Sequence, residues 1–151
     1  IRAIVANNIV GASESSSGNA GSGIEIQSGS ANTFVGGMNS TGMNIIEGNG
    51  GHGVRIAGGA VSNSVRFNRI VNNALGNLTL EEGANGGIAP PVVTRSFPVV
   101  AGTTPSNSLI DVYTGEEDGS SGALAWIETT FAFGNGEFTV QTPRENLGRA
   151  L

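Results

Sequence analysis

The feature that most constrains this fold is a four-residue phrase that recurs along the first half of the chain. Gly or Asn is followed by an apolar, a polar and a second apolar residue. The three copies read Gly23-Ile24-Glu25-Ile26, Gly53-Val54-Arg55-Ile56 and Asn77-Leu78-Thr79-Leu80. Their starts lie 30 and 24 residues apart, and self-similarity at such a period indicates a stacked repeat architecture.

Two further phrases recur at matching intervals. Asn8-Ile9-Val10 returns as Asn44-Ile45-Ile46 and Asn68-Arg69-Ile70, and Asn32-Thr33-Phe34-Val35 returns as Asn63-Ser64-Val65. Each repeat therefore contains about three short strands, which fits a parallel β-helix whose rungs stack about 4.8 Å apart. Side chains alternate between the two faces of a strand. We therefore expect Ile24 and Ile26 to point inward over the equivalent apolar pairs of the next rungs, with Glu25 beside Arg55 outside.

Asn and Gly are predicted at the corners of the rungs. Both tolerate the left-handed backbone conformation that a tight corner requires. The side chains of Asn8, Asn44 and Asn68 are candidates for a hydrogen-bonded ladder at one corner. The longer stretches 12–23 and 36–42 are expected to be loops inserted into a rung, and such loops often carry function.

On these phrases, residues 3–87 resemble the pectate-lyase-like, right-handed parallel β-helix repeat proteins. The resemblance implies a right-handed parallel β-helix of about three rungs. It is less informative about activity, because the group includes lyases, hydrolases, epimerases, surface proteins and phage tailspikes.

The composition changes near residue 90. All five Pro residues follow that point, whereas 18 of the 25 Gly residues precede it. Residues 108–114, 123–130 and 136–142 read as half-buried strands, and 95–100 as an edge strand that tolerates Pro98. Trp126 is expected in the core of this module, the alternative being a sugar-stacking platform with Tyr113.

Residues 88–142 resemble the small immunoglobulin-like module that follows some bacterial surface β-helices. A full sandwich has about seven strands, so four predict an incomplete antiparallel β-sandwich. We thus expect an all-β chain with two domains, 1–87 and 88–151. The chain starts within a rung and stops before its sandwich is complete, so we expect a homo-oligomer formed through open strand edges.

Composition excludes several classes of protein. The formal net charge of −5 argues against nucleic-acid binding, which needs a basic surface. No apolar run is long enough for a transmembrane helix, so no membrane insertion is expected. The absence of Cys excludes disulfides and thiolate metal sites.

No catalytic residues are assigned. Lyases of this shape need an acidic cluster for Ca²⁺ with a basic residue beside it, and residues 1–87 contain no Asp. Glu25 and Glu47 are the expected neighbours of the Arg residues across a rung, as a catalytic set or, more simply, as surface ion pairs. The candidate polymer-binding residues are Glu25, Arg55, Arg66 and Arg69.

No cofactor is assigned, although one acidic turn could hold Ca²⁺. Glu116, Glu117 and Asp118 are the candidate metal ligands, the alternative being a solvated turn. His52 lies in a Gly-rich turn that resembles a calcium-binding nonapeptide but lacks its Asp, so a solvent-facing His is expected.

The predicted function is non-catalytic. We expect a secreted or cell-surface structural, adhesive or polymer-binding protein that self-associates, with a polysaccharide as a candidate partner. Two alternatives stay open: a fragment of a carbohydrate-active lyase or glycoside hydrolase, and a shaft like that of a phage tail fibre.

Overall fold

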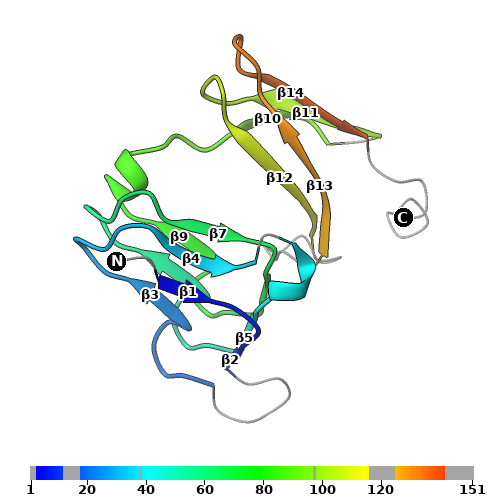
Figure 1. Cartoon of the computed structure of the whole chain (residues 1–151). Helices are drawn as coiled ribbons and strands as arrows, with labels where there is room; N and C mark the ends of the chain where they lie inside the picture. Colours follow the sequence, from blue (N-terminus) through cyan, green and yellow to red (C-terminus); the bar gives the residue numbers. More distant parts are fainter. Residues whose placement is uncertain (1–2, 12–17, 38, 97, 116–124, 142–151) are drawn as a thin grey trace. The chain divides into compact units, whose positions relative to one another are not determined.

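The chain folds from short β-strands and turns (Figure 1). The computed structural model describes residues 3–11, 18–37, 39–96, 98–115 and 125–141. Those ranges contain two 3₁₀ turns but no α-helix, and thus nothing helical that could cross a membrane. Two compact units are formed, one of Ile1–Ile88 with Thr114–Trp126 and one of Ala89–Tyr113 with Ile127–Leu151.

The first unit contains a parallel β-helix of three rungs, as predicted. Equivalent strands of successive rungs pair in parallel and form three sheets, ordered β1-β4-β7, β2-β5-β8 and β3-β6-β9. The first rung holds β1 (Ala3–Val5), β2 (Ile9–Gly11) and β3 (Ile24–Ile26), the second β4 (Thr33–Gly36), β5 (Ile45–Glu47) and β6 (Val54–Ile56), and the third β7 (Ser64–Arg66), β8 (Arg69–Val71) and β9 (Leu78–Leu80).

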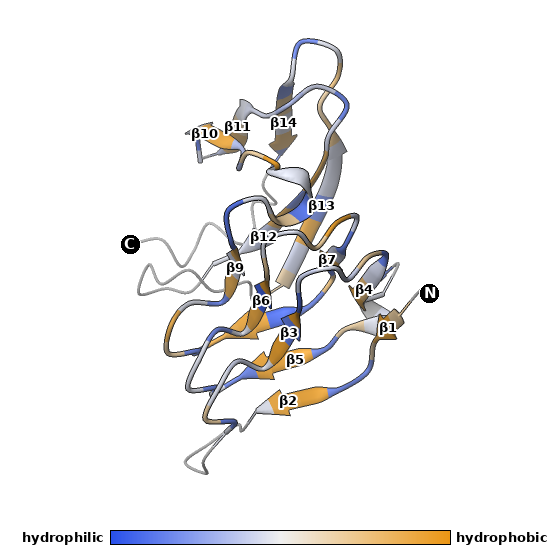
Figure 2. Cartoon of the chain, turned by 90° about the vertical axis from the view of Figure 1, so that its left-hand side faces the viewer, coloured by the Kyte–Doolittle hydropathy of each residue, from blue (hydrophilic) through white to orange (hydrophobic). Residues whose placement is uncertain are grey.

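The predicted register is confirmed on the β2-β5-β8 and β3-β6-β9 sheets. On the β1-β4-β7 sheet the alignment of Asn32 with Asn63 is off by one residue, because Phe34 rather than Thr33 pairs with Ser64. Ile24 pairs with Val54 and Val54 with Leu78, and the outward Glu25 pairs with Arg55. Inside the coil, Val35, Ile46, Val54 and Ile56 are almost fully buried. Figure 2 shows the apolar strands stacked from rung to rung. Each strand is only three or four residues long, so burial of this shared column stabilises all three rungs together.

Leu78 and Leu80 depart from the expectation of a buried apolar pair. They stack on Val54 and Ile56 but are 48% and 40% exposed, because β9 is the outer strand of its sheet. Beyond it, the 3₁₀ turn η2 (Ala84–Gly86) places Ala84 in the core cluster and covers part of the third rung.

The two inserted stretches explain the unequal repeat lengths. Ile9 pairs with Ile45, 36 residues later, whereas Ile45 pairs with Arg69, 24 residues later. The stretch 36–42 includes the 3₁₀ turn η1 (Ser40–Gly42), whereas the equivalent corner of the third rung passes directly from Arg66 to Arg69. Residues 12–17 of the other predicted loop lie outside the described ranges.

The second unit contains one antiparallel sheet and most of another, whose residues Thr114, Ala125 and Trp126 belong to the first unit. β10 (Val92–Arg95), β11 (Val99–Thr103) and β14 (Glu137–Gln141) form one sheet in the order β10-β11-β14, and β12 (Leu109–Thr114) pairs with β13 (Ala125–Phe131). Phe138 and Val140 of β14 are buried and alternate with exposed neighbours. Described side chains of both sheets line an open, largely apolar pocket of about 390 Å³.

Two details of the C-terminal prediction are wrong. The edge strand expected at 95–100 is two strands, since β10 ends at Arg95, β11 begins at Val99 and Pro98 lies in the turn between them. Pro has no N–H to donate, which favours a turn at this point. Trp126, expected in the core, is 43% exposed, and its ring lies 5.4 Å from that of Phe67 in the same unit.

Candidate functional site

The outer face of the β3-β6-β9 sheet carries a cluster of charged side chains. Register places Glu25, Arg55 and Thr79 in one outward column. Arg55 Nη1 lies 3.5 Å from Glu25 Oε1, and Arg55 Nη2 forms a closer ion pair with Glu81. The guanidinium is therefore shared by carboxylates from the first and third rungs, and all three side chains stay about one-third or more exposed.

Glu81 is held by the backbone as well as by charge. The backbone N–H of Gly58 donates to Glu81 Oε2 at 3.2 Å. This hydrogen bond, followed by that of Arg55, lowers the pKa of the Glu81 carboxyl from its usual value. Both contacts favour the ionised form, so Glu81 is an anion rather than a proton donor at neutral pH.

His52 lies in the Gly-rich turn that precedes β6. Its Nδ1 is 2.9 Å from the Thr79 hydroxyl, and its backbone N–H donates to Ser22 Oγ at 3.3 Å. These contacts reach the rungs on either side, so this turn is tied into the stack.

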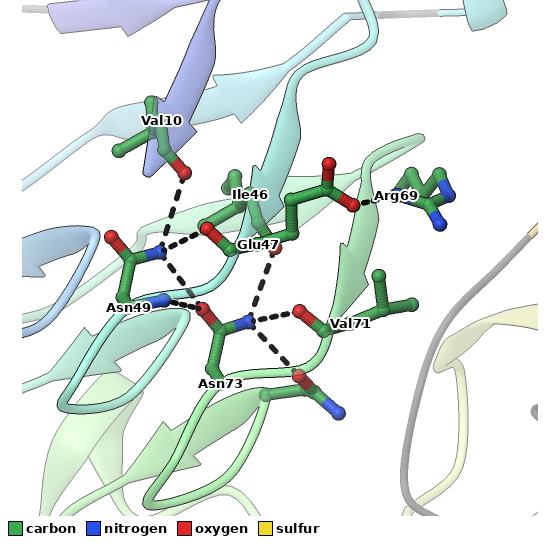
Figure 3. Close-up of polar contacts among 8 residues, drawn as sticks. Val10, Ile46, Glu47, Asn49, Arg69, Val71 and Asn73 are labelled. Atoms are coloured by element: carbon green, nitrogen blue, oxygen red, sulfur yellow. Dashed lines mark hydrogen bonds and ion pairs between the residues drawn. The ribbon is translucent and has the colours of Figure 1, made fainter. Parts of the chain in front are cut away.

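A second ion pair joins the neighbouring parallel strands β5 and β8. Arg69 pairs with Glu47, whose side chain is only 11% exposed (Figure 3). Both Glu residues expected beside an Arg across a rung have such a neighbour, Glu25 with Arg55 and Glu47 with Arg69. Glu81 was not anticipated, because it lies just beyond β9, out of register with Arg55.

Ladders of Asn side chains connect the corners of successive rungs. In the predicted ladder, Asn44 Nδ2 donates to Asn68 Oδ1 at 2.9 Å, and Asn8 Nδ2 donates to Asn44 Oδ1 at 3.1 Å. A second ladder runs from Asn49 Nδ2 to Asn73 Oδ1 at 2.8 Å (Figure 3). The prediction missed this second ladder, although its 24-residue spacing equals that of Asn44 and Asn68.

The side chain of Asn73 forms hydrogen bonds to residues of both the second and the third rung. Its Oδ1 accepts from the backbone N–H and side-chain amide of Asn49, and its Nδ2 donates to the carbonyls of Ile46 and Val71 and to Asn77 Oδ1 (Figure 3). Among the described residues, no buried side-chain nitrogen or oxygen is left without a partner.

The four predicted polymer-binding residues do not form one site. Glu25 and Arg55 lie on the β3-β6-β9 sheet, whereas Arg66 ends β7 and Arg69 begins β8. The Arg66 guanidinium lies 4.9 Å from the ring centroid of Phe67, in cation–π contact. Of the four, Glu25 and Arg55 are in direct contact.

The predicted metal ligands cannot be placed. Glu116, Glu117 and Asp118 lie outside the described residues. Within the part of the chain that is described, no group of three or more His, Cys, Asp or Glu residues is arranged to hold a metal ion.

Comparison with protein-family models, curated proteins and solved structures found no match for this chain. In the Arg55 cluster, one guanidinium faces two carboxylates, so the cluster keeps a net negative charge.

Proposed function

We propose that this protein is a non-catalytic, extracellular β-helix protein with a structural or adhesive function, which binds a polymer and self-associates. The observation that carries the proposal is the pairing of its outer carboxylates. Of the four Glu residues described within 3–88, Glu25, Glu47 and Glu81 are in ion pairs with Arg.

Pairing of this kind is unfavourable for catalysis. A general acid must hold a proton near neutral pH, and a glycosidase needs two carboxyl groups that face one bond. The Glu81 pKa is shifted in the opposite direction, downward. An Arg that acts as the base of a lyase must first lose its proton. Two neighbouring carboxylates favour the protonated guanidinium of Arg55, which opposes that role.

The repeat phrases and the short β-rich module after the coil support placing this chain near the pectate-lyase-like β-helix proteins and bacterial immunoglobulin-like modules. Many β-helix proteins of that group act outside the cell. Secretion or surface display is therefore part of the proposal, as is the use of the long outer faces of the coil for contact with a polymer.

The proposal is tested by incubating the full chain with polygalacturonate, alginate and neutral glucans. We expect binding of a polymer by co-sedimentation, with no new reducing ends and no absorbance from unsaturated products. Release of either product, at a rate that Arg55→Gln abolishes, would instead establish the lyase or hydrolase alternative.

A further inference from the structure

The second unit carries a further candidate surface for polymer binding. A pocket of about 360 Å³ lies at the junction of β13 and β14, within this unit. Its lining residues combine aromatic rings with hydroxyl, amide and carboxylate groups: Thr130, Phe131, Phe133, Asn135, Glu137 and Thr139. Small-ligand sites have volumes of about 300–1,000 Å³ and a few convergent polar groups on an apolar surface.

Two of the aromatic side chains are unusually exposed. Phe133 is 70% exposed and Phe131 is 41% exposed, although Phe138 beside them is buried. The rings of Phe131 and Phe133 meet edge to face with centroids 5.6 Å apart. Neighbouring exposed aromatic rings form an apolar patch of the kind that marks an interaction site.

The loop that presents Phe133 is held in place by backbone hydrogen bonds. Ala132 is fully buried and exchanges hydrogen bonds with the backbone of Asn107 and Ser108 at 2.8 and 2.9 Å. Gly136 closes the turn by donating to the Phe133 carbonyl at 2.7 Å, and its own carbonyl accepts from Thr104 at 2.9 Å. The ring is therefore presented on a fixed loop, which lowers the entropy cost of binding.

The polar side of the pocket is equally ordered. Asn135 Nδ2 donates to Glu137 Oε2 at 2.7 Å, and Asn135 Oδ1 accepts from the Glu137 backbone N–H at 3.1 Å. Glu137 and Thr139 alternate with the buried Phe138 along β14, so both face outward. Amide, carboxylate and hydroxyl groups thus line one side of the pocket and aromatic rings the other.

We infer that this pocket binds a neutral sugar ring of a polysaccharide. A pyranose has an apolar face of C–H groups that packs on an aromatic ring, and hydroxyls that pair with carboxylate, amide and hydroxyl partners. Among the residues that the structure describes, the lining includes Glu137 but no Arg or Lys, and the chain has a net charge of −5. A uronic-acid polymer would be repelled here, which selects uncharged sugars.

This inference deepens the polymer-binding part of the proposed function and rests on it. The test is affinity electrophoresis of the full chain in native gels that contain hydroxyethylcellulose, galactomannan or polygalacturonate. We expect at least one neutral polymer to retard the protein and polygalacturonate not to do so. Phe133→Ala should weaken the apparent affinity about tenfold, a change of about 1.4 kcal/mol, and the Phe131→Ala, Phe133→Ala double variant should migrate as in an empty gel.

Leu109→Ala is the matched control, since Leu109 is 52% exposed on β12 and does not line the pocket; its retardation should equal that of the wild type. Circular dichroism of each variant checks the fold, and the exposed Phe133 can be removed without opening a core cavity. Absence of retardation by both neutral polymers, or equal retardation of the Phe133 variants, would overturn the inference.

Three other outcomes separate this inference from other readings. Retardation by polygalacturonate alone would overturn it while leaving polymer binding intact. Loss of retardation in excess choline chloride, or Phe133-dependent binding to phosphatidylcholine vesicles, would assign the rings to a cation or a lipid and overturn the sugar assignment. New reducing ends, with Phe133-dependent retardation retained, would uphold the sugar pocket and overturn the non-catalytic function.

Discussion

Asn is the residue on which the corners of this β-helix depend. A corner needs a left-handed backbone and a hydrogen-bonding partner for groups that leave the strands. Asn7, Asn32 and Asn72 supply positive φ angles of 59°, 58° and 54°, whereas Asn44, Asn49 and Asn73 supply the buried amides. Different Asn residues meet the two needs, so the effect of replacing an Asn depends on its position in the rung.

Asn73→Ala is expected to lower the free energy of unfolding by about 2–4 kcal/mol. The change removes contacts to Asn49, Asn77 and two backbone carbonyls, and it leaves buried polar groups unsatisfied. Chemical denaturation measures the loss. Asn8→Ala is the control and should cost less than about 1 kcal/mol, because Asn8 is exposed and its backbone N–H still donates to Asn44 Oδ1. Equal losses would contradict a buried ladder.

The lowered pKa of Glu81 predicts that the stability difference between wild type and a Glu81→Gln variant depends on pH. The Glu81 pKa is lower in the folded chain than the usual value, so its contribution is fully present above the unfolded pKa of about 4.3. That contribution is lost as pH falls through the folded pKa. We expect Glu81→Gln to be less stable than wild type at pH 7, and the gap in unfolding free energy to close as pH falls below about 4.

Denaturant titrations at a series of pH values test this expectation. Glu82→Gln removes the same charge one residue away, without removing the carboxylate that pairs with Arg55 and Gly58. The hypothesis fails if both variants follow one pH profile.

The strands of the coil are too short to be stable alone, so the stability of the coil depends on contacts between whole rungs. Parallel pairing brings backbones close together wherever a rung turns. Gly36 has φ of 99°, and a Cβ there would lie 1.9 Å from the Arg66 carbonyl oxygen of the next rung. Gly29 also has a positive φ, 80°, but a Cβ would meet no atom within 4 Å. Gly36 is therefore required both for close packing and for its backbone conformation, whereas Gly29 is required only for its backbone conformation.

Gly36→Ala should therefore cost about 3 kcal/mol or more, the sum of left-handed strain and overpacking. Gly29→Ala should cost only the strain, about 1–2 kcal/mol. Thermal or urea unfolding of both variants measures the difference. Equal losses of unfolding free energy in the two variants would contradict this prediction, because they would show that β4 and β7 move apart around the new Cβ without a measurable cost.

At the scale of the whole molecule, the first rung offers the surface expected to drive self-association. Its strands β1, β2 and β3 each have one neighbour within their described sheets, and Ile4 and Ile9 are 64% and 70% exposed. Unpaired edges and exposed apolar side chains both favour contact with another chain. The low charge density, 13% of residues, opposes such contact only weakly.

We expect the mass measured by light scattering to rise with protein concentration. Ile9→Lys should suppress the rise, because it places a charge on the exposed face of β2, whereas Ile88→Lys, at a residue of the same type that is 55% exposed outside any strand, should not. A mass that stays monomeric at every concentration would remove self-association from the proposed function.

The register of the coil could be predicted because its information is local and periodic. The Ile24, Val54 and Leu78 phrases fix which residues stack, and an opposite-charge pair such as Glu25 and Arg55 follows from register alone. The Asn49–Asn73 ladder was predictable by the same spacing. Glu81 was not, because a long Arg side chain reaches a carboxylate that register does not align with it.

The all-β class, the three rungs and the Asn corners could be predicted from the sequence, because the alternation and the repeat spacing of similar short strands are visible along the chain. Which side chains converge from unlike elements follows only from the folded arrangement. Arg55 is shared by carboxylates of two other rungs, Trp126 lies against Phe67, and Phe131 and Phe133 meet beside Glu137. Those contacts depend on how loops and strand ends are placed in space, which no period in the chain encodes.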